Sequence, residues 1–143
     1  MPFKQLQSPP SELTLCSTPA GPRLHRTPVK ELESLRDAPN QADSLADFRA
    51  ELIELRAEFE PGATSVVNLN ARGVAVSYDA GRQELTVNGQ RSPSPLRNGR
   101  QRLAIYTDRT ALEVFASDGL TYVPVPVVPE EQNLTVQVGV TGD

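Results

Sequence analysis

The feature that most constrains the fold is an alternation of apolar and polar residues that recurs in short runs from about Phe48 onward. In one run Ile53, Leu55, Ala57 and Phe59 alternate with Glu54, Arg56, Glu58 and Glu60, and in the last run Leu134, Val136, Val138 and Val140 alternate with polar residues or glycine. A period of two predicts half-buried β-strands. Turn signals such as Pro61-Gly62, Asn88-Gly89 and Ser117-Asp118-Gly119 separate the runs. Seven or eight short strands joined by turns predict an all-β fold, an antiparallel β-sandwich of two sheets.

The first third of the chain has a different pattern. Residues 1–29 are rich in proline and contain two short strand candidates, 12–17 and 23–27, around Gly21-Pro22. Residues 30–36 predict a short helix with Leu32 and Leu35 on one side, and the polar residues 37–47 predict a linker. We therefore expect three parts: 1–29, a linker with a short helix at 30–47, and a sandwich domain at 48–143.

Composition disfavours several classes of function. The net charge of −4 and the scattered Lys and Arg residues do not suit a nucleic-acid surface. No apolar run reaches the ~20 residues that a membrane helix requires, and no export signal is visible, so we expect a cytoplasmic location unless such a signal preceded residue 1. The single cysteine, Cys16, leaves no internal disulfide and no thiol-based metal site, and we interpret it as a small apolar residue in a strand rather than as a nucleophile paired with His25.

Four blocks of sequence, in order along the chain, carry a family resemblance. They are Met1-Pro2-Phe3 with Glu12-Leu13-Thr14-Leu15, then Gly21-Pro22-Arg23-Leu24 with Pro28 to Glu33, then Leu55 to Gly62, and finally Asp108 to Gly119. The last block resembles the signature strand and turn in the C-terminal β-sandwich of glycoside hydrolase family 32. The first two blocks resemble the end of that family's five-bladed catalytic propeller and the connection to the sandwich. The resemblance implies that residues 1–29 are a remnant of the last propeller blade.

The resemblance also implies where catalysis occurs. Family members are retaining glycosidases that cleave fructose from sucrose, levan and inulin, and retention needs two carboxyl groups ~5–5.5 Å apart. In the family both carboxyls belong to propeller motifs, Trp-Met-Asn-Asp-Pro-Asn-Gly and Glu-Cys, and an Arg-Asp-Pro motif holds the sugar; none of the three occurs here, and the chain has no tryptophan. Asp108 and Glu113 are ~17 Å apart along an extended strand and cannot form such a pair. We expect no catalytic, cofactor-binding or metal-ligating residues in this chain.

We interpret the residues of the signature block as parts of the fold rather than of a catalytic site. Asp108 and Arg109 are expected at a turn, Asp108 accepting backbone N–H bonds and Arg109 pairing across strands. Ala111, Glu113 and Phe115 share one face of a strand that is apolar on both faces, which predicts burial on both sides. With the propeller absent we expect one of those faces to be exposed and to cause self-association. The apolar, proline-containing residues 122–129 predict an edge strand or an extended segment.

Four functions remain open at this stage. The resemblance favours a structural sandwich module of a fructan- or sucrose-cleaving enzyme, non-catalytic alone, with the catalytic propeller as its partner. One alternative is a free-standing carbohydrate-binding (fructan-binding) module with weak sugar contact at Tyr106. A second is a subunit that acts in trans on a separate propeller and restores its activity. The third is a truncated gene product without function. The sequence does not indicate which fructoside the parent enzyme cleaves.

Overall fold

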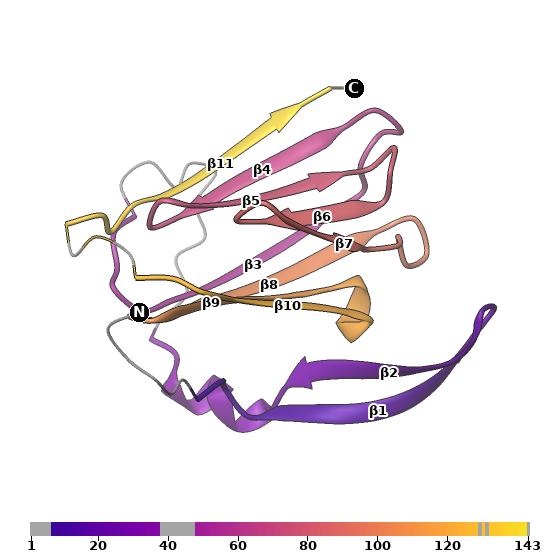
Figure 1. The fold of residues 1–143 in the computed structure, drawn as a ribbon, viewed down its shortest axis with the longest axis horizontal. Helices are drawn as coiled ribbons and strands as arrows, with labels where there is room; N and C mark the ends of the chain where they lie inside the picture. Colours follow the sequence, from indigo (N-terminus) through magenta and orange to yellow (C-terminus); the bar gives the residue numbers. More distant parts are fainter. Residues whose placement is uncertain (1–6, 38–47, 129, 131, 143) are drawn as a thin grey trace.

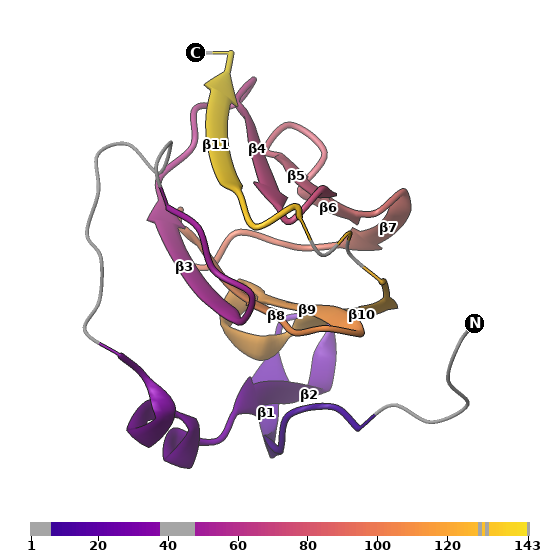
Figure 2. The same ribbon diagram turned by 90° about the vertical axis from the view of Figure 1, so that its left-hand side faces the viewer.

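The computed structural model describes residues 7–37, 48–128, 130 and 132–142, and they form a β-sandwich with a hairpin packed beneath it (Figures 1 and 2). The elements in chain order are β1 (Ser11–Thr18), β2 (Gly21–Pro28), the short 3-10 helix η1 (Lys30–Leu35), β3 (Ile53–Phe59), β4 (Val66–Ala71), β5 (Val74–Asp79), β6 (Glu84–Val87), β7 (Gln90–Pro93), β8 (Gln101–Thr107), β9 (Ala111–Ala116), the one-turn helix η2 (Ser117–Gly119), β10 (Thr121–Pro126) and β11 (Val136–Thr141). The predicted all-β sandwich is confirmed.

The sandwich consists of two antiparallel sheets. The four-stranded sheet has the order β10-β9-β8-β3, and the five-stranded sheet has the order β11-β4-β5-β6-β7. Asn88 and Gly89 both have positive φ, and they join β6 to β7 in the tight hairpin that this dipeptide predicts. Segment 122–129 contributes β10, which lies at an edge of the four-stranded sheet as its prolines predict. β1 and β2 form a separate two-stranded sheet.

The core lies between the two sheets and consists of the inward-facing residues that the alternation predicts. Large, fully buried members include Tyr78, Leu85, Ile105, Leu112 and Val114. The last strand departs from the prediction, because Val136 is buried whereas Val138, two residues on, is 51% exposed. β11 is an edge strand, so Val138 has a neighbouring strand on one side only, although its partner Leu69 in β4 is buried.

A buried polar cluster closes one end of the sandwich. Its members, Ser94, Gln101 and Ser117, come from the end of β7, the start of β8 and η2. Ser94 Oγ and Ser117 Oγ lie 2.9 Å apart, Gln101 Nε2 donates to Ser94 Oγ at 3.0 Å, and the Ser117 backbone N–H donates to Gln101 Oε1 at 2.8 Å. Since the side-chain polar atoms of the three residues are hydrogen-bonded to one another and to backbone groups, the cluster fixes η2 in place.

The hairpin β1–β2 packs on η2 and on the outer face of β9 and β10. His25 Nδ1 lies 3.1 Å from the backbone oxygen of Asp118, and the guanidinium of Arg26 lies over the ring of Tyr122 at 4.5 Å. Gly119 has φ +93°, and a Cβ atom there would lie 2.7 Å from the backbone oxygen of Arg26. Glycine at this position thus allows the closest approach between η2 and β2.

This packing corrects one sequence expectation. The face of β9 formed by Ala111, Glu113 and Phe115 is buried within the chain itself, each of these residues being less than 5% exposed. Phe115 packs between the rings of Tyr106 and Tyr122, with centroids at 5.8 and 4.9 Å. The expected burial on both faces of the strand is therefore confirmed. The expected exposure of one face is wrong, because the hairpin and the neighbouring aromatic rings cover it.

Glu113 is a buried carboxylic acid in this layer. Its Oε2 accepts a hydrogen bond of 3.0 Å from the Tyr122 hydroxyl. Burial raises the pKa of the Glu113 carboxyl above its usual value, whereas the hydrogen bond from Tyr122 and the charge of Arg26 act in the opposite sense. The same burial raises the pKa of Tyr122.

Gly119→Ala should destabilise the fold by about 1 kcal/mol or more, because the new Cβ meets the Arg26 backbone at a positive φ. Gly89→Ala is the matched control, since Gly89 has φ +80° and no atom within 4 Å of the added Cβ. Urea unfolding of both variants separates backbone strain from the clash with the hairpin. Equal losses in the two variants would contradict close packing of the hairpin on η2.

Glu113→Gln should stabilise the protein at neutral pH and lose this advantage on acidification. A carboxyl whose pKa is raised by folding contributes stability below its unfolded pKa and loses that contribution as the pH rises through its folded value. Glutamine stays neutral throughout, so the difference between variant and wild type should grow from pH 4 to pH 7 in favour of glutamine. Glu58→Gln is the opposite control, because Arg100 and Arg102 lower the pKa of the Glu58 carboxyl. Parallel pH profiles of unfolding free energy for Glu113→Gln and wild type would refute the prediction.

Candidate functional site

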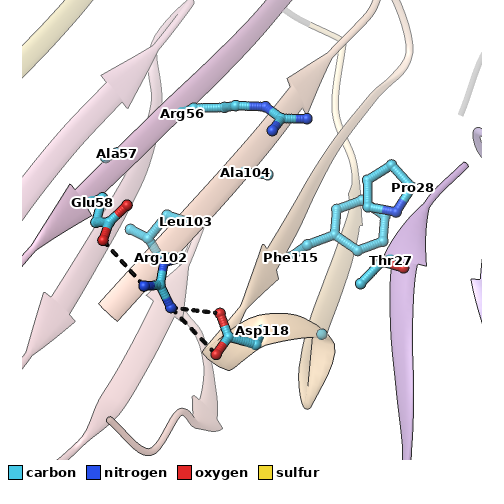
Figure 3. Close-up of a pocket in the computed structure, with 11 residues that line it drawn as sticks. Thr27, Pro28, Arg56, Ala57, Glu58, Arg102, Leu103, Ala104, Phe115 and Asp118 are labelled. Atoms are coloured by element: carbon cyan, nitrogen blue, oxygen red, sulfur yellow. Dashed lines mark hydrogen bonds and ion pairs between the residues drawn. The ribbon is translucent and has the colours of Figure 1, made fainter. Parts of the chain in front are cut away.

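A pocket of about 440 Å³ lies between the hairpin and the outer face of the four-stranded sheet (Figure 3). Its lining comes from β2, β3, β8, β9 and η2, namely Thr27, Pro28, Arg56, Ala57, Glu58, Arg102, Leu103, Ala104, Phe115, Asp118 and Gly119. These residues are far apart in the sequence. Strand pairing brings β3, β8 and β9 together, and docking of the hairpin adds Thr27 and Pro28.

Each charged residue of the pocket is in an ion pair, with another lining residue or with a neighbour outside the lining. Arg102 Nη2 donates to Glu58 Oε1 at 3.2 Å, and Arg102 Nη1 donates to Asp118 Oδ1 at the same distance. Arg56 Nε donates to Glu54 Oε1 at 2.7 Å. The Arg100 and Arg102 guanidinium groups hold the pKa of the Glu58 carboxyl below its usual value, so Glu58 is ionised at neutral pH.

These carboxyls do not make an acid/base pair for glycoside hydrolysis. A retaining mechanism needs one carboxyl with a raised pKa beside one that is ionised. Among the carboxyls of the described residues whose pKa is shifted, Glu113 is the one whose pKa is raised, and its side chain is buried beneath the hairpin, bonded to Tyr122. Glu51, Glu54 and Glu58 all have lowered pKa values because each is bonded to arginine. The two carboxyls that line the pocket, Glu58 and Asp118, are both in ion pairs with Arg102.

The residues singled out from the signature block, Asp108 and Arg109, stabilise a turn and an ion pair of the fold. Asp108 Oδ1 accepts hydrogen bonds from the backbone N–H groups of Thr110 and Ala111 at 2.6 and 2.7 Å, as expected for a turn. Arg109 pairs with Glu51 at 2.6 Å. The Tyr106 hydroxyl donates to Glu54 at 3.1 Å, and its ring packs at 88° to the ring of Phe115, so both the hydroxyl and the ring have partners within the chain.

Cys16 and His25, the candidates for a nucleophile and its base, both lie within the hairpin as part of its packing. Cys16 is partly buried in β1, in line with its interpretation as a small strand residue. His25 is buried against η2 in the opposite strand. The register pairs Cys16 with Arg23 and His25 with Thr14, so the structure does not pair the cysteine with the histidine across the hairpin.

A second surface of interest is the outer face of the hairpin, which sequence reasoning missed. Leu15 and Leu24 are directly opposite each other in the register, and Leu13 lies two residues from Leu15 on the same face. Their exposed fractions are 72%, 56% and 52%. We call Leu13, Leu15 and Leu24 the leucine face. The alternation in 12–17 held the signal for it, but it did not show which side of the strand would be covered.

Other kinds of site find no support in the part of the chain that the structure describes. There, no group of three or more His, Cys, Asp and Glu residues could hold a metal ion. No helix within the described ranges has the length and apolarity to cross a membrane.

Solved structures of two related enzymes share this fold. The exo-inulinase from Aspergillus awamori superposes with a TM-score of 0.65 at 16% identity, over 94% of this chain and 33% of the inulinase. The β-fructofuranosidase from Schwanniomyces occidentalis superposes with a TM-score of 0.53 at 13% identity, over 93% of this chain and 36% of that enzyme. At these identities the likeness concerns the fold.

Sequence comparisons extend the likeness to a family. The chain is 28% identical to the levanase of Bacillus subtilis (strain 168), over 92% of its own length and 24% of the levanase, so it spans about a quarter of that protein. The family model described as "Glycosyl hydrolases family 32 C terminal" matches residues 24–142. Because this match covers well over half of the sequence and the fold agrees with it, the chain belongs to the family of glycosyl hydrolase family 32 C-terminal domains.

Proposed function

We propose that this chain is the structural C-terminal module of a fructan- or sucrose-cleaving glycoside hydrolase, and that it stabilises a catalytic propeller without breaking bonds itself. The observation that carries the proposal is the hairpin β1–β2. One side of it is docked on the sandwich, and the other side exposes the leucine face. Family membership and the length of the levanase relative support a larger parent protein.

The hairpin has the features of an incomplete sheet. In the described residues β1 pairs with β2 alone, so its other edge is open to a further strand. A two-stranded sheet is marginally stable in water and needs additional strands or a covering layer. The sandwich supplies one cover. In our proposal the parent's propeller supplies the other, which agrees with residues 1–29 being the remnant of the last propeller blade.

The leucine face is suited to burial against a catalytic domain. Fully burying a leucine side chain contributes about 1.5–3 kcal/mol relative to leaving it exposed. Three leucines on one face of the hairpin would therefore stabilise the partner when buried against it, and the contacts of the same hairpin with η2 would connect that partner to the sandwich.

Without its partner the 143-residue chain should self-associate through the leucine face. An exposed cluster of apolar side chains favours association in water, so the apparent mass in light scattering should rise with protein concentration. The double variant Leu15→Asp/Leu24→Asp should stay monomeric. Leu35→Asp, which changes a leucine that is 79% exposed on η1, is the control and should behave as wild type. Association that persists unchanged in the double variant would exclude the leucine face as the cause.

A chimera tests the proposed support of catalysis. The 143-residue chain replaces the matching segment of the Bacillus subtilis levanase, and thermal unfolding and fructose release from levan and sucrose are measured. The chimera should be active, and Leu15→Asp within it should lower the melting temperature by at most about 2–4 °C for each kcal/mol of lost burial, the value for a 150–250-residue domain, whereas Leu35→Asp should not.

Two outcomes would contradict the proposal. The first is release of fructose by the 143-residue chain alone, above the rate without protein. The second is a chimera whose stability is the same with Leu15 and with Asp at that position. Activation of a sandwich-deleted levanase by the separately added chain would support the same role exerted in trans.

A further inference from the structure

We propose that docking of the hairpin β1–β2 on the sandwich is linked to a proton on Glu113, so that the hairpin is held most tightly in acid and loosens when this carboxyl ionises. The feature behind the proposal is the position of the carboxyl, which is buried in the layer between β9 and the hairpin. The inference goes beyond the proposed structural function, because it concerns how one part of this chain holds another and is measured without a propeller.

The Glu113 side chain has almost no access to water on the hairpin side of the sheet. It is 2% exposed, and its neighbour on the same strand face, Phe115, packs between two tyrosine rings. Tyr122, which donates to Glu113 Oε2 at 3.0 Å, is itself covered by the guanidinium of Arg26 in β2. Figures 1 and 2 show β2 on this side of the sheet. The hairpin is therefore part of the cover that keeps water from the carboxyl.

The titratable and charged groups around Glu113 come from each element packed against it, namely Tyr106 of β8 with Glu54 of β3 bonded to its hydroxyl, Tyr122 of β10, Arg26 of β2, and Asp108 of the turn before β9. The charge of Arg26 favours the ionised carboxyl, and the charge of Asp108 opposes it. In the part of the chain that the structure describes, Glu113 belongs to none of the ion pairs. Burial without an ion pair disfavours the charged form of a carboxyl.

The direction of the effect follows from where the proton binds more tightly. While the hairpin is docked, burial holds the pKa of the Glu113 carboxyl above its usual value. When the hairpin leaves, the carboxyl meets water and its pKa falls back toward that value. Docking is therefore strongest below the undocked pKa, and it weakens as the pH rises through the docked pKa. A single proton changes the docking equilibrium by at most about tenfold per pH unit.

Native-state hydrogen exchange of the isotope-labelled 143-residue chain tests the proposal. A two-stranded sheet alone is marginally stable in water, so the amides that pair β1 with β2 exchange when the hairpin leaves the sandwich. They should exchange faster than the amides of β4 and β5, which shows that undocking rather than global unfolding is measured. After correction for intrinsic exchange, the opening equilibrium of the hairpin should rise between about pH 4 and pH 8, by at most about tenfold per unit.

Glu113→Gln should make the opening equilibrium of the hairpin independent of pH over the same range. Glutamine keeps an oxygen that accepts from the Tyr122 hydroxyl, and it has no proton to lose. Glu84→Gln is the matched control, because this carboxylate lies on β6 of the other sheet, paired with Arg91. It should keep the pH dependence of the wild type.

A second measurement needs no substitution at Glu113. Because linkage is reciprocal, a change that loosens the hairpin must lower the pKa of the Glu113 carboxyl. Titration of its carboxyl ¹³C signal should show this decrease in Gly119→Ala, where the added Cβ meets the Arg26 backbone, and not in Gly89→Ala, where it meets nothing within 4 Å.

Three results would overturn the proposal. One is a Glu113 carboxyl that titrates at its usual value in the wild type or is unmoved in Gly119→Ala. Another is a hairpin opening equilibrium that stays constant or falls as the pH rises. The third is a wild-type pH dependence in Glu113→Gln, which would assign the effect to His25, the titratable side chain that contacts η2. Failure of the chimera experiment would leave these results untouched, since it involves the leucine face.

Discussion

The buried hydrogen bonds among Ser94, Gln101 and Ser117 are the constraint on which the functional surfaces depend. They hold η2 in an unusual conformation in which Ser117, Asp118 and Gly119 all have positive φ. That turn carries the backbone oxygen that meets His25 and the glycine that admits β2. If these hydrogen bonds were broken, η2 would no longer hold the hairpin against the sandwich. The pocket would then lose its wall from β2, and the leucine face would no longer be fixed relative to the sandwich.

Docking of the hairpin divides the molecule into surfaces with different physical properties. Beneath the hairpin, aromatic rings and the buried Glu113 form a closed layer. Beside it, paired arginines and carboxylates border an open pocket. On its far side the leucine face is exposed to solvent. A module that supports a catalytic domain would use the last surface, because its apolar side chains are the ones left exposed.

Sequence reasoning located most strands because alternation with a period of two reports burial directly. β9 was expected at 111–116 and has those bounds, and the Asn88-Gly89 turn is where its φ preference predicts it. β7, with the sequence Gln-Arg-Ser-Pro, has no apolar alternation, and only the preceding turn indicated it. The pocket could not be predicted, because its lining combines residues 27–28, 56–58, 102–104 and 115–119, and no local pattern shows which strands become neighbours.

The sequence by itself determined the fold class, the family and the inward-facing residues, since each depends on local periodicity, turn chemistry or motif. It also determined that the propeller motifs that carry the family's catalytic carboxyls do not occur here. The tertiary structure decided which faces are covered. Periodicity showed that β9 is apolar on both sides, but only docking of β2 on η2 buried Phe115 and Glu113 and left Leu13, Leu15 and Leu24 exposed instead. The reason is that burial on the second face of a sheet depends on contacts between residues almost a hundred positions apart, such as His25 and Asp118.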